Sequence, residues 1–199
     1  MLSESALSRA PAKFSRGVTM LEVLIAILIL TIGLLGVAGM QAQMQNAELE
    51  AYQRAQAIVL MQDMVDRVNA NRKNAASYVT GTPLGTASTI DCSAPATVAA
   101  KDQCEWSSAL LGAAETSGGT KLGAMTGARG CISNPVITMP RQMVVAVAWQ
   151  GVSPTAAPAA TTCGQGSYGG DERFRRAMIA SVTIGCLQND PTTGICITP

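Results

Sequence analysis

The residue with the plainest chemical potential is an acid, Glu22, near the start of a long apolar run. Val18 to Met40 reads VTMLEVLIAILILTIGLLGVAGM, and Glu22 is its only charged residue. An ionised acid inside a bilayer costs several kcal/mol unless it finds a partner or reaches the interface. In one interpretation Glu22 reaches the interface and favours the positive end of the helix dipole. In the other it pairs with a free amino group, which Val18 gains if the chain is cut after Gly17.

The other reactive side chains are six cysteines in the C-terminal half of the chain, at positions 92, 104, 131, 163, 186 and 196. None forms the CxxC pair of a zinc or thioredoxin-like site, so the even count indicates disulfides. Disulfides persist in the periplasm or at the cell surface. The chain has no histidine, which excludes imidazole-based triads and histidine-ligated metals. We expect no metal and no cofactor.

The composition indicates contact with lipid. Of 199 residues, 48% are hydrophobic and only 14% are charged, which is unusually apolar for a soluble protein of this length. The net charge of +1 hides an asymmetry, because residues 1–17 carry Arg9, Lys13 and Arg16 against Glu4. We call residues 1–17 the leader and expect it to be cytoplasmic. No basic footprint for nucleic acid remains.

A single long helix must carry the acid. Residues 23–40 are uncharged and long enough to span a bilayer. The helical pattern continues without proline into a polar stretch with one apolar face, formed by Ala51, Ala55, Ile58, Met61, Val65 and Val68. We therefore predict one helix from about Val18 to about Asn74, in a segment 18–75 whose residues 18–40 are transmembrane.

Residues 76–199 form an exported globular head in this interpretation. Gly81 to Lys101 is a predicted loop, and Asp102 to Ala114 a short helix that Asp102 could cap. Three strands follow, at Arg129–Ser133, Met143–Gln150 and Arg176–Cys186. We expect an antiparallel meander packed on the upper half of the long helix, hence an α+β fold.

The strand arrangement favours one disulfide pairing among fifteen. The loop with Cys163 leaves from the end of the meander where Cys131 lies, which favours Cys131–Cys163. Cys92–Cys104 would then join the loop to the short helix, and Cys186–Cys196 would close the C-terminal tail.

The segment Arg16-Gly17-Val18-Thr19-Met20-Leu21-Glu22 resembles the prepilins of type IV pili and type II secretion systems. Their signature is a basic leader that ends in glycine, then a hydrophobic stretch with glutamate at its fifth position. The resemblance implies cleavage between Gly17 and Val18 by the prepilin peptidase, N-methylation of Val18, and a role for Glu22 in assembly. Val18 replaces the commoner phenylalanine.

Major pilins commonly carry a helix-kinking proline where this chain has Gly39. Gly33, Gly36 and Gly39 either make the helix soft enough to melt on packing or allow close helix contacts through small residues. Both interpretations stay open.

Over its whole length the chain is similar to the minor pilins called type IV pilus modification protein V, the PilV group. The similarity rests on LEVLIAILILTIGLLGVAGMQ, the short helix with Trp106, the strand VVAVAWQG and the strand that ends near Cys186. It implies a type IV pilin-like fold and a structural role in priming or capping pilus assembly, in support of adhesion and twitching motility. The implied partners are other minor pilins, the major pilin, the prepilin peptidase, the inner-membrane assembly platform and membrane lipid. The expected location is the inner membrane with a periplasmic head, and then the pilus tip.

Three other kinds of protein share some of these features. A secretory signal would have a shorter, uncharged apolar region. A minor pseudopilin of a type II secretion system would share the leader, anchor and helix. A membrane-anchored periplasmic enzyme is disfavoured because the head offers no histidine, no GxSxG and no nucleotide-binding loop.

Arg173, Arg175 and Arg176 form a basic cluster. We interpret it as a solvated strand entry or as a contact for an acidic partner or anionic surface.

Overall fold

The computed structural model describes residues 17–86, 91–112, 116–117, 120–121, 125–136, 141–186, 188–192 and 196–198. The leader up to Arg16 lies outside the described residues. The chain divides into two compact units between Gln45 and Asn46, each described here by itself. The first contains the apolar start of the long helix, and the second contains the end of that helix and the head.

The long helix, α1, spans Met20–Ala70, followed by a 3₁₀ helix, η1, at Arg72–Tyr78. The predicted α-helix was therefore two residues too long at its start and four at its end. Thr19 sets the start, because its side chain and carbonyl both accept the Glu22 N–H. The tighter turns of η1 then carry the chain out of the helix.

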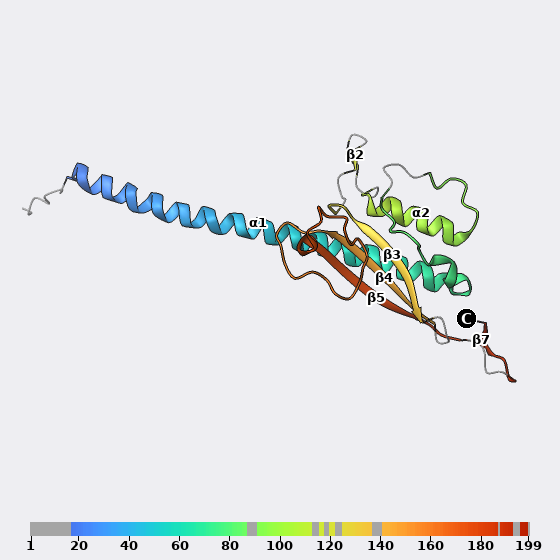
Figure 1. Ribbon diagram of the computed structural model, residues 1–199. Coiled ribbons are helices and arrows are strands. Elements are labelled where there is room, and N and C mark those ends of the chain that lie inside the picture. Colours follow the sequence, from blue (N-terminus) through green and yellow to red (C-terminus); the bar gives the residue numbers. More distant parts are fainter. Residues whose placement is uncertain are drawn as a thin grey trace, which may run out of the picture. The chain divides into compact units, whose positions relative to one another are not determined.

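Three antiparallel strands form the main sheet, in the order β3-β4-β5 (Figure 1). They are β3 at Arg129–Val136, β4 at Arg141–Gln150 and β5 at Arg175–Ile184. The predicted meander is confirmed. β3 ends later than predicted, β4 and β5 begin earlier, and β5 ends at Ile184, two residues before the predicted end at Cys186. β4 and β5 pair in an unbroken register over ten residues each, from Arg141 opposite Ile184 to Gln150 opposite Arg175.

The short helix, α2, spans Val98–Leu110 and begins four residues before the predicted start. The predicted cap, Asp102, is wrong: the side chain of Thr97 accepts the Ala100 N–H at 3.1 Å and caps the helix. Asp102 lies within α2 and accepts hydrogen bonds from Tyr78 and Arg67. Residues 113–114, the end of the predicted helix, lie outside the described residues.

The core of the second unit lies between the end of α1, the sheet and α2 (Figure 1). Ala57, Met61, Met64 and Val68 are the buried residues of α1. They pack with Met143, Val145, Val147 and Trp149 of β4, Val182 and Ile184 of β5, and Trp106 and Leu110 of α2. The Trp106 indole N–H donates to the Leu60 carbonyl at 2.7 Å, so α2 is fixed to α1 by a polar bond as well as by packing.

The predicted apolar face of the long helix was only partly right. Met61 and Val68 are buried, Val65 is partly buried, and Ile58 is 44% exposed. Ala57 and Met64 fill the remaining core positions, because residues 57, 61, 64 and 68 follow the helical repeat along one line.

Shorter elements complete the fold. A small hairpin with two residues in each strand pairs β1, Thr116–Ser117, with β2, Thr120–Lys121. A second hairpin pairs β6, Gln188–Asn189, with β7, Cys196–Thr198. The 3₁₀ helix η2, Glu172–Phe174, leads into β5. None of these was expected from the sequence.

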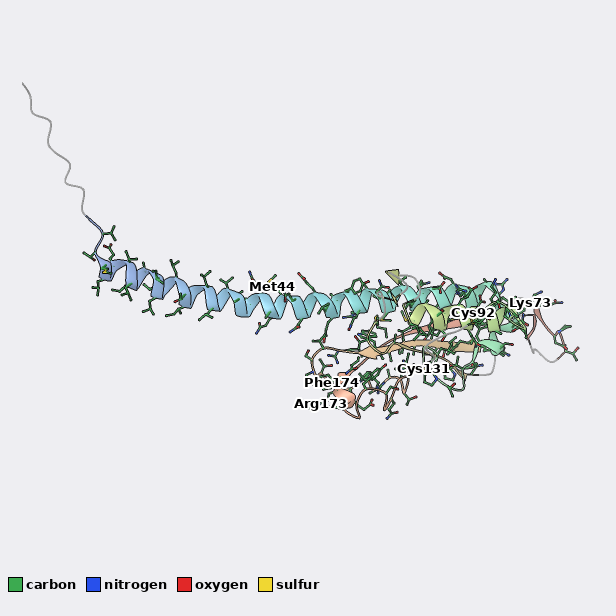
Figure 2. The ribbon with its side chains drawn as sticks, turned by 90° about the horizontal axis from the view of Figure 1, so that it is seen from above. Met44, Lys73, Cys92, Cys131, Arg173 and Phe174 are labelled. Atoms are coloured by element: carbon green, nitrogen blue, oxygen red, sulfur yellow. A yellow bond between two sulfur atoms is a disulfide. The ribbon has the colours of Figure 1, made fainter. Side chains whose placement is uncertain are left out.

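Two disulfides join the pairs favoured by the sequence. Cys92 bonds Cys104 with 5.7 Å between their Cα atoms, and Cys131 bonds Cys163 with 5.8 Å. Cys92 and Cys131 are labelled in Figure 2. The third predicted pair, Cys186–Cys196, involves the side chain of Cys196, which lies outside the described side chains, so that pairing stays a prediction.

Candidate functional site

The start of α1 is a capped helix end that presents an acid. The Glu22 N–H lies 3.3 Å from the Thr19 hydroxyl oxygen and 3.1 Å from the Thr19 carbonyl oxygen. Glu22 is the third residue of the helix, so Thr19 and Glu22 have the spacing of a capping box. This motif was not predicted, although Thr19 and Glu22 stand three residues apart in the sequence. An acid in the first turn also interacts favourably with the helix dipole.

The Glu22 carboxylate is exposed and has no hydrogen-bond or ion-pair partner within the described part of the chain. Gly17 and Val18 are exposed and lie outside the helix. Val18 was expected to be the first helical residue, but the cap at Thr19 places it two residues before the helix. The bond between Gly17 and Val18 therefore lies in non-helical, accessible backbone, next to an unpaired carboxylate.

The helix that follows presents an apolar surface on all sides. Every residue from Gly17 to Leu49 is exposed, and α1 is long and apolar enough to cross a membrane. Side chains project outward around the helix up to the labelled Met44 (Figure 2). The hydroxyl of Thr31 donates to the Leu28 carbonyl at 2.8 Å, so it places no unsatisfied donor in the apolar surface. Glu22 is thus the one charge between Val18 and Met40, and the next acid of α1, Glu48, lies beyond this apolar run.

Gly33, Gly36 and Gly39 lie within this unbroken helix. A Cβ atom built at each would meet nothing within 4 Å. The helix surface at these glycines is therefore open within the described structure. Both predicted roles, helix softness and close helix contact, refer to the helix when it packs against other helices.

The second unit contains an ion-pair network that joins α1 to α2. Arg67 donates to Asp63, Asp102 and Glu105, with the closest contact, 2.7 Å, to Glu105. Burial alone would lower the pKa of Arg67, but the hydrogen bonds that Arg67 donates to Glu105 and Asp63 raise it overall. Tyr78 donates to Asp102, and burial together with this bond raises the Tyr78 pKa to about 12. The network was not predicted, because its members are far apart in the sequence.

The basic cluster at the start of β5 is not a solvated patch. Arg175 is only 4% exposed and donates to the carbonyls of Pro158, Thr161 and Cys163, and it pairs with Glu172. It therefore holds the disulfide loop against the strand. The expected solvated interpretation fits only Arg173, which pairs with Asp171 at the surface. Figure 2 labels Arg173 and Phe174 at this corner.

Arg176 has a different partner. Its guanidinium lies 3.1 Å from a carboxylate oxygen of Glu50 on α1. Glu50 also accepts from the Val152 N–H at 3.2 Å. Burial raises the pKa of Glu50, but the hydrogen bonds from Ser153 and Arg176 lower it overall, so the carboxylate is held ionised. All three arginines of the predicted cluster therefore have intramolecular acidic partners.

Comparisons with known families agree with these observations. Residues 13–38 match the model described as the prokaryotic N-terminal methylation motif. Residues 39–108 match the model described as type IV pilin Tt1218. Comparison with curated proteins and with solved structures gave no match.

The two matches adjoin and together run from the end of the leader through α1 to α2. They support a type IV pilin, and the α+β architecture is consistent with them: an apolar N-terminal helix and a small antiparallel sheet with disulfides. Over residues 13–108 the chain is similar to type IV pilins and carries their N-terminal methylation motif, and its fold is type IV pilin-like.

Proposed function

We propose that this chain is the precursor of a minor pilin, a structural subunit that primes or caps the type IV pilus and supports adhesion and twitching motility. The observation that carries the proposal is the exposed apolar helix with its single unpaired acid, Glu22, within the methylation motif. A surface of this kind needs lipid before assembly and other helices afterwards.

The first step is removal of the leader. Cleavage between Gly17 and Val18 by the prepilin peptidase creates a new amino terminus at Val18, which is then N-methylated. The non-helical, exposed backbone at Gly17 and Val18 supports this step, because a protease must bind its substrate in an extended form. The motif match at residues 13–38 encloses the same bond.

The second step is assembly. Inside a filament the start of α1 leaves water, and an unpaired carboxylate there is costly. The amino group of a neighbouring subunit neutralises Glu22, so a subunit in the wrong register leaves a buried charge without a partner. This pairing guides the position of each subunit, while the apolar side chains supply most of the contact area.

The head lies outside the cytoplasm in this proposal. The two disulfides, Cys92–Cys104 and Cys131–Cys163, favour an oxidising compartment. The basic leader favours the cytoplasmic side. The chain therefore spans the inner membrane once before it enters the pilus, where it contacts other minor pilins, the major pilin and the assembly platform.

The alternative is a minor pseudopilin of a type II secretion system, which would use the same leader and helix. The match of residues 39–108 to a type IV pilin model favours the pilus. Deleting the gene separates the two functions: loss of surface pili with normal exoprotein secretion supports the minor pilin, and the converse supports the pseudopilin.

Mass spectrometry of the protein from the cell envelope tests the processing step. We expect an N-terminal peptide that begins at methylated Val18. A mature protein that starts at Met1, or beyond Gly39, would contradict the proposal.

A further inference from the structure

The two edges of the main sheet differ. The outer edge of β3 is covered by the chain itself: Gly130 and Leu84 exchange N–H···O bonds of 3.1 and 2.8 Å. Four residues earlier in the same segment, the Thr80 N–H donates to the Ile132 carbonyl at 2.9 Å, and the Thr80 hydroxyl accepts from the Ile132 N–H. At Gly130 and Ile132 this edge is therefore occupied by the chain itself.

The outer edge of β5 is open over most of its length. The Gly151 N–H donates to the Phe174 carbonyl. Because hydrogen-bonded positions alternate in an antiparallel pair, the backbone N–H and C=O groups of residue 174 and of every second residue after it point towards β4. The backbone groups of the alternate residues, Ala177, Ile179, Ser181 and Thr183, point away from β4. In the described ranges these groups have no backbone partner.

This open edge lacks the features that usually protect an edge strand. Such strands are commonly shielded by proline, by inward charges or by bulges. From Ala177 to Ile184 the strand has no proline and no charged residue, and its register with β4 is unbroken. Ile179 is 42% exposed, and Ser181 and Thr183 are exposed beside it. The edge is therefore a ready template for an added strand.

A groove lies beside the start of this edge. It has a volume of about 570 Å³ and is lined by Ala47, Glu50, Ala51, Arg54, Trp149, Arg176, Ala177 and Met178. The Glu50 carboxylate pairs with Arg176 and accepts hydrogen bonds from the Val152 and Ser153 N–H groups. Arg54, in contrast, has no partner among the described residues. The groove therefore has mainly apolar walls and one positive charge, Arg54, without a counter-charge among the described residues.

We propose that the open edge of β5 binds an extended strand of a different pilus subunit, whose acidic side chain enters the groove and pairs with Arg54. The inference rests on the proposed function, because it assumes neighbouring subunits. A second copy of this chain fits less well, since none of the strands in the described ranges contains Asp or Glu. Backbone bonds to β5 provide the affinity, and the acid near Arg54 provides register and selectivity.

Proline scanning of the full-length protein in cells tests the strand addition. Ile179→Pro and Ser181→Pro each remove an outward N–H and leave the bonds to β4 in place. We expect recovery in sheared pili to fall about tenfold, as loss of one or more backbone bonds implies. Ile179→Ala and Ser181→Ala, which change only side chains, should be recovered like the wild type. Unchanged membrane abundance and protease resistance would show that the proline variants fold.

Charge reversal provides a second test that does not touch the strand. Arg54→Glu changes an exposed residue without a partner in the described structure, so it should fold normally and still lose recovery in pili several-fold. Arg54→Lys should retain it. If wild-type protein enters pili and both the proline variants and Arg54→Glu do so equally, the strand addition is wrong while the proposed function stands. Wild-type protein absent from pili would instead overturn the proposed function.

Photo-crosslinking identifies the occupant. With benzoylphenylalanine at position 179 in the full-length chain, we expect an adduct to a segment of another pilus subunit that contains an acidic residue. An adduct to a second copy, or only to residues 187–199 of the same chain, would overturn the proposal.

Discussion

At the scale of single residues, Glu22 has one role in the structure, at the start of α1, and one proposed role, in assembly. Its backbone N–H belongs to the helix cap made by Thr19, while its carboxylate has no partner among the residues that the structure describes. The capping function needs no charge. The proposed assembly function needs the charge and is independent of the cap.

Replacing Glu22 by glutamine distinguishes these functions. The variant keeps the backbone bond to Thr19 and loses only the dipole interaction within the subunit, worth about 0.3–1 kcal/mol. We expect normal membrane insertion and leader cleavage, but recovery in sheared pili at least about tenfold lower, because the partner amine then has no counter-charge. Quantitative immunoblots of membrane and pilus fractions measure both.

The same chemical change at Glu48, another exposed glutamate of α1, is the matched control and should have little effect. Glu22→Asp should restore most of the assembly. Equal recovery of Glu22→Gln and wild type would show that the charge is dispensable.

Tyr78 gives the head a response to alkaline pH. Burial and the bond to Asp102 raise its pKa to about 12 from an ordinary 10.0. The protonated phenol therefore stabilises the fold fully below pH 10, and this contribution disappears as the pH rises towards 12. Burial also raises the pKa of Tyr168 to about 12. We expect the urea midpoint of the detergent-solubilised protein to fall over this range.

Tyr78→Phe should reduce that fall without abolishing it, because Tyr168 remains. Identical pH dependence in the variant and the wild type would exclude Tyr78 as a contributor. Tyrosinate absorbance, recorded over the same titration, shows whether loss of the proton accompanies unfolding.

At the scale of elements, the position of α2 depends on a glycine in β3. A Cβ atom at Gly130 would lie 2.3 Å from the Trp106 ring. The ring is fully buried and also bonds to Leu60 on α1, so it has little freedom to move. Gly130 is therefore the place where strand, short helix and long helix meet closely.

Gly130→Ala should destabilise the protein by about 1–3 kcal/mol through overpacking. Gly81→Ala is the control, because a Cβ there meets nothing within 4 Å and its effect should be small. Urea unfolding followed by tryptophan fluorescence measures both in full-length protein in detergent. A neutral Gly130→Ala would mean that α2 shifts freely on the sheet.

Elements with local causes were predictable. The apolar run, the absence of proline and the β-branched clusters predicted α1 and the meander, and the cysteine positions favoured both of the disulfides described here. The start of α2 was predicted wrongly because two nearby residues, Thr97 and Asp102, can both cap a helix. The structure uses Thr97. The network of Arg67 with Glu105, and the burial of Arg175, depend on contacts across the fold that no spacing encodes.

At the scale of the whole molecule, a small core is divided among one end of a long helix, three strands and a short helix. Such a head gains much of its stability from cross-links. The Cys131–Cys163 bond closes a separation of 32 residues and also holds the loop that Arg175 binds. The Cys92–Cys104 bond closes a separation of only 12.

Removing these bonds should therefore have unequal effects. Loop-closure entropy predicts a loss of about 4 kcal/mol for Cys131→Ser/Cys163→Ser and about 3 kcal/mol for Cys92→Ser/Cys104→Ser. The first variant should also loosen the Arg175 loop, so we expect the lower urea midpoint and the greater loss of envelope protein for that pair. Pulse-chase measurement of the full-length chains in cells reports the loss of envelope protein.

Equal losses from the two double variants would mean that closing the longer loop does not dominate stability. Faster loss of the Cys92/Cys104 variant would place the weakest part of the head at α2. Either double variant should still insert and lose its leader, because α1 and Gly17 lie outside the cross-linked region; a defect in cleavage would show that the head influences processing.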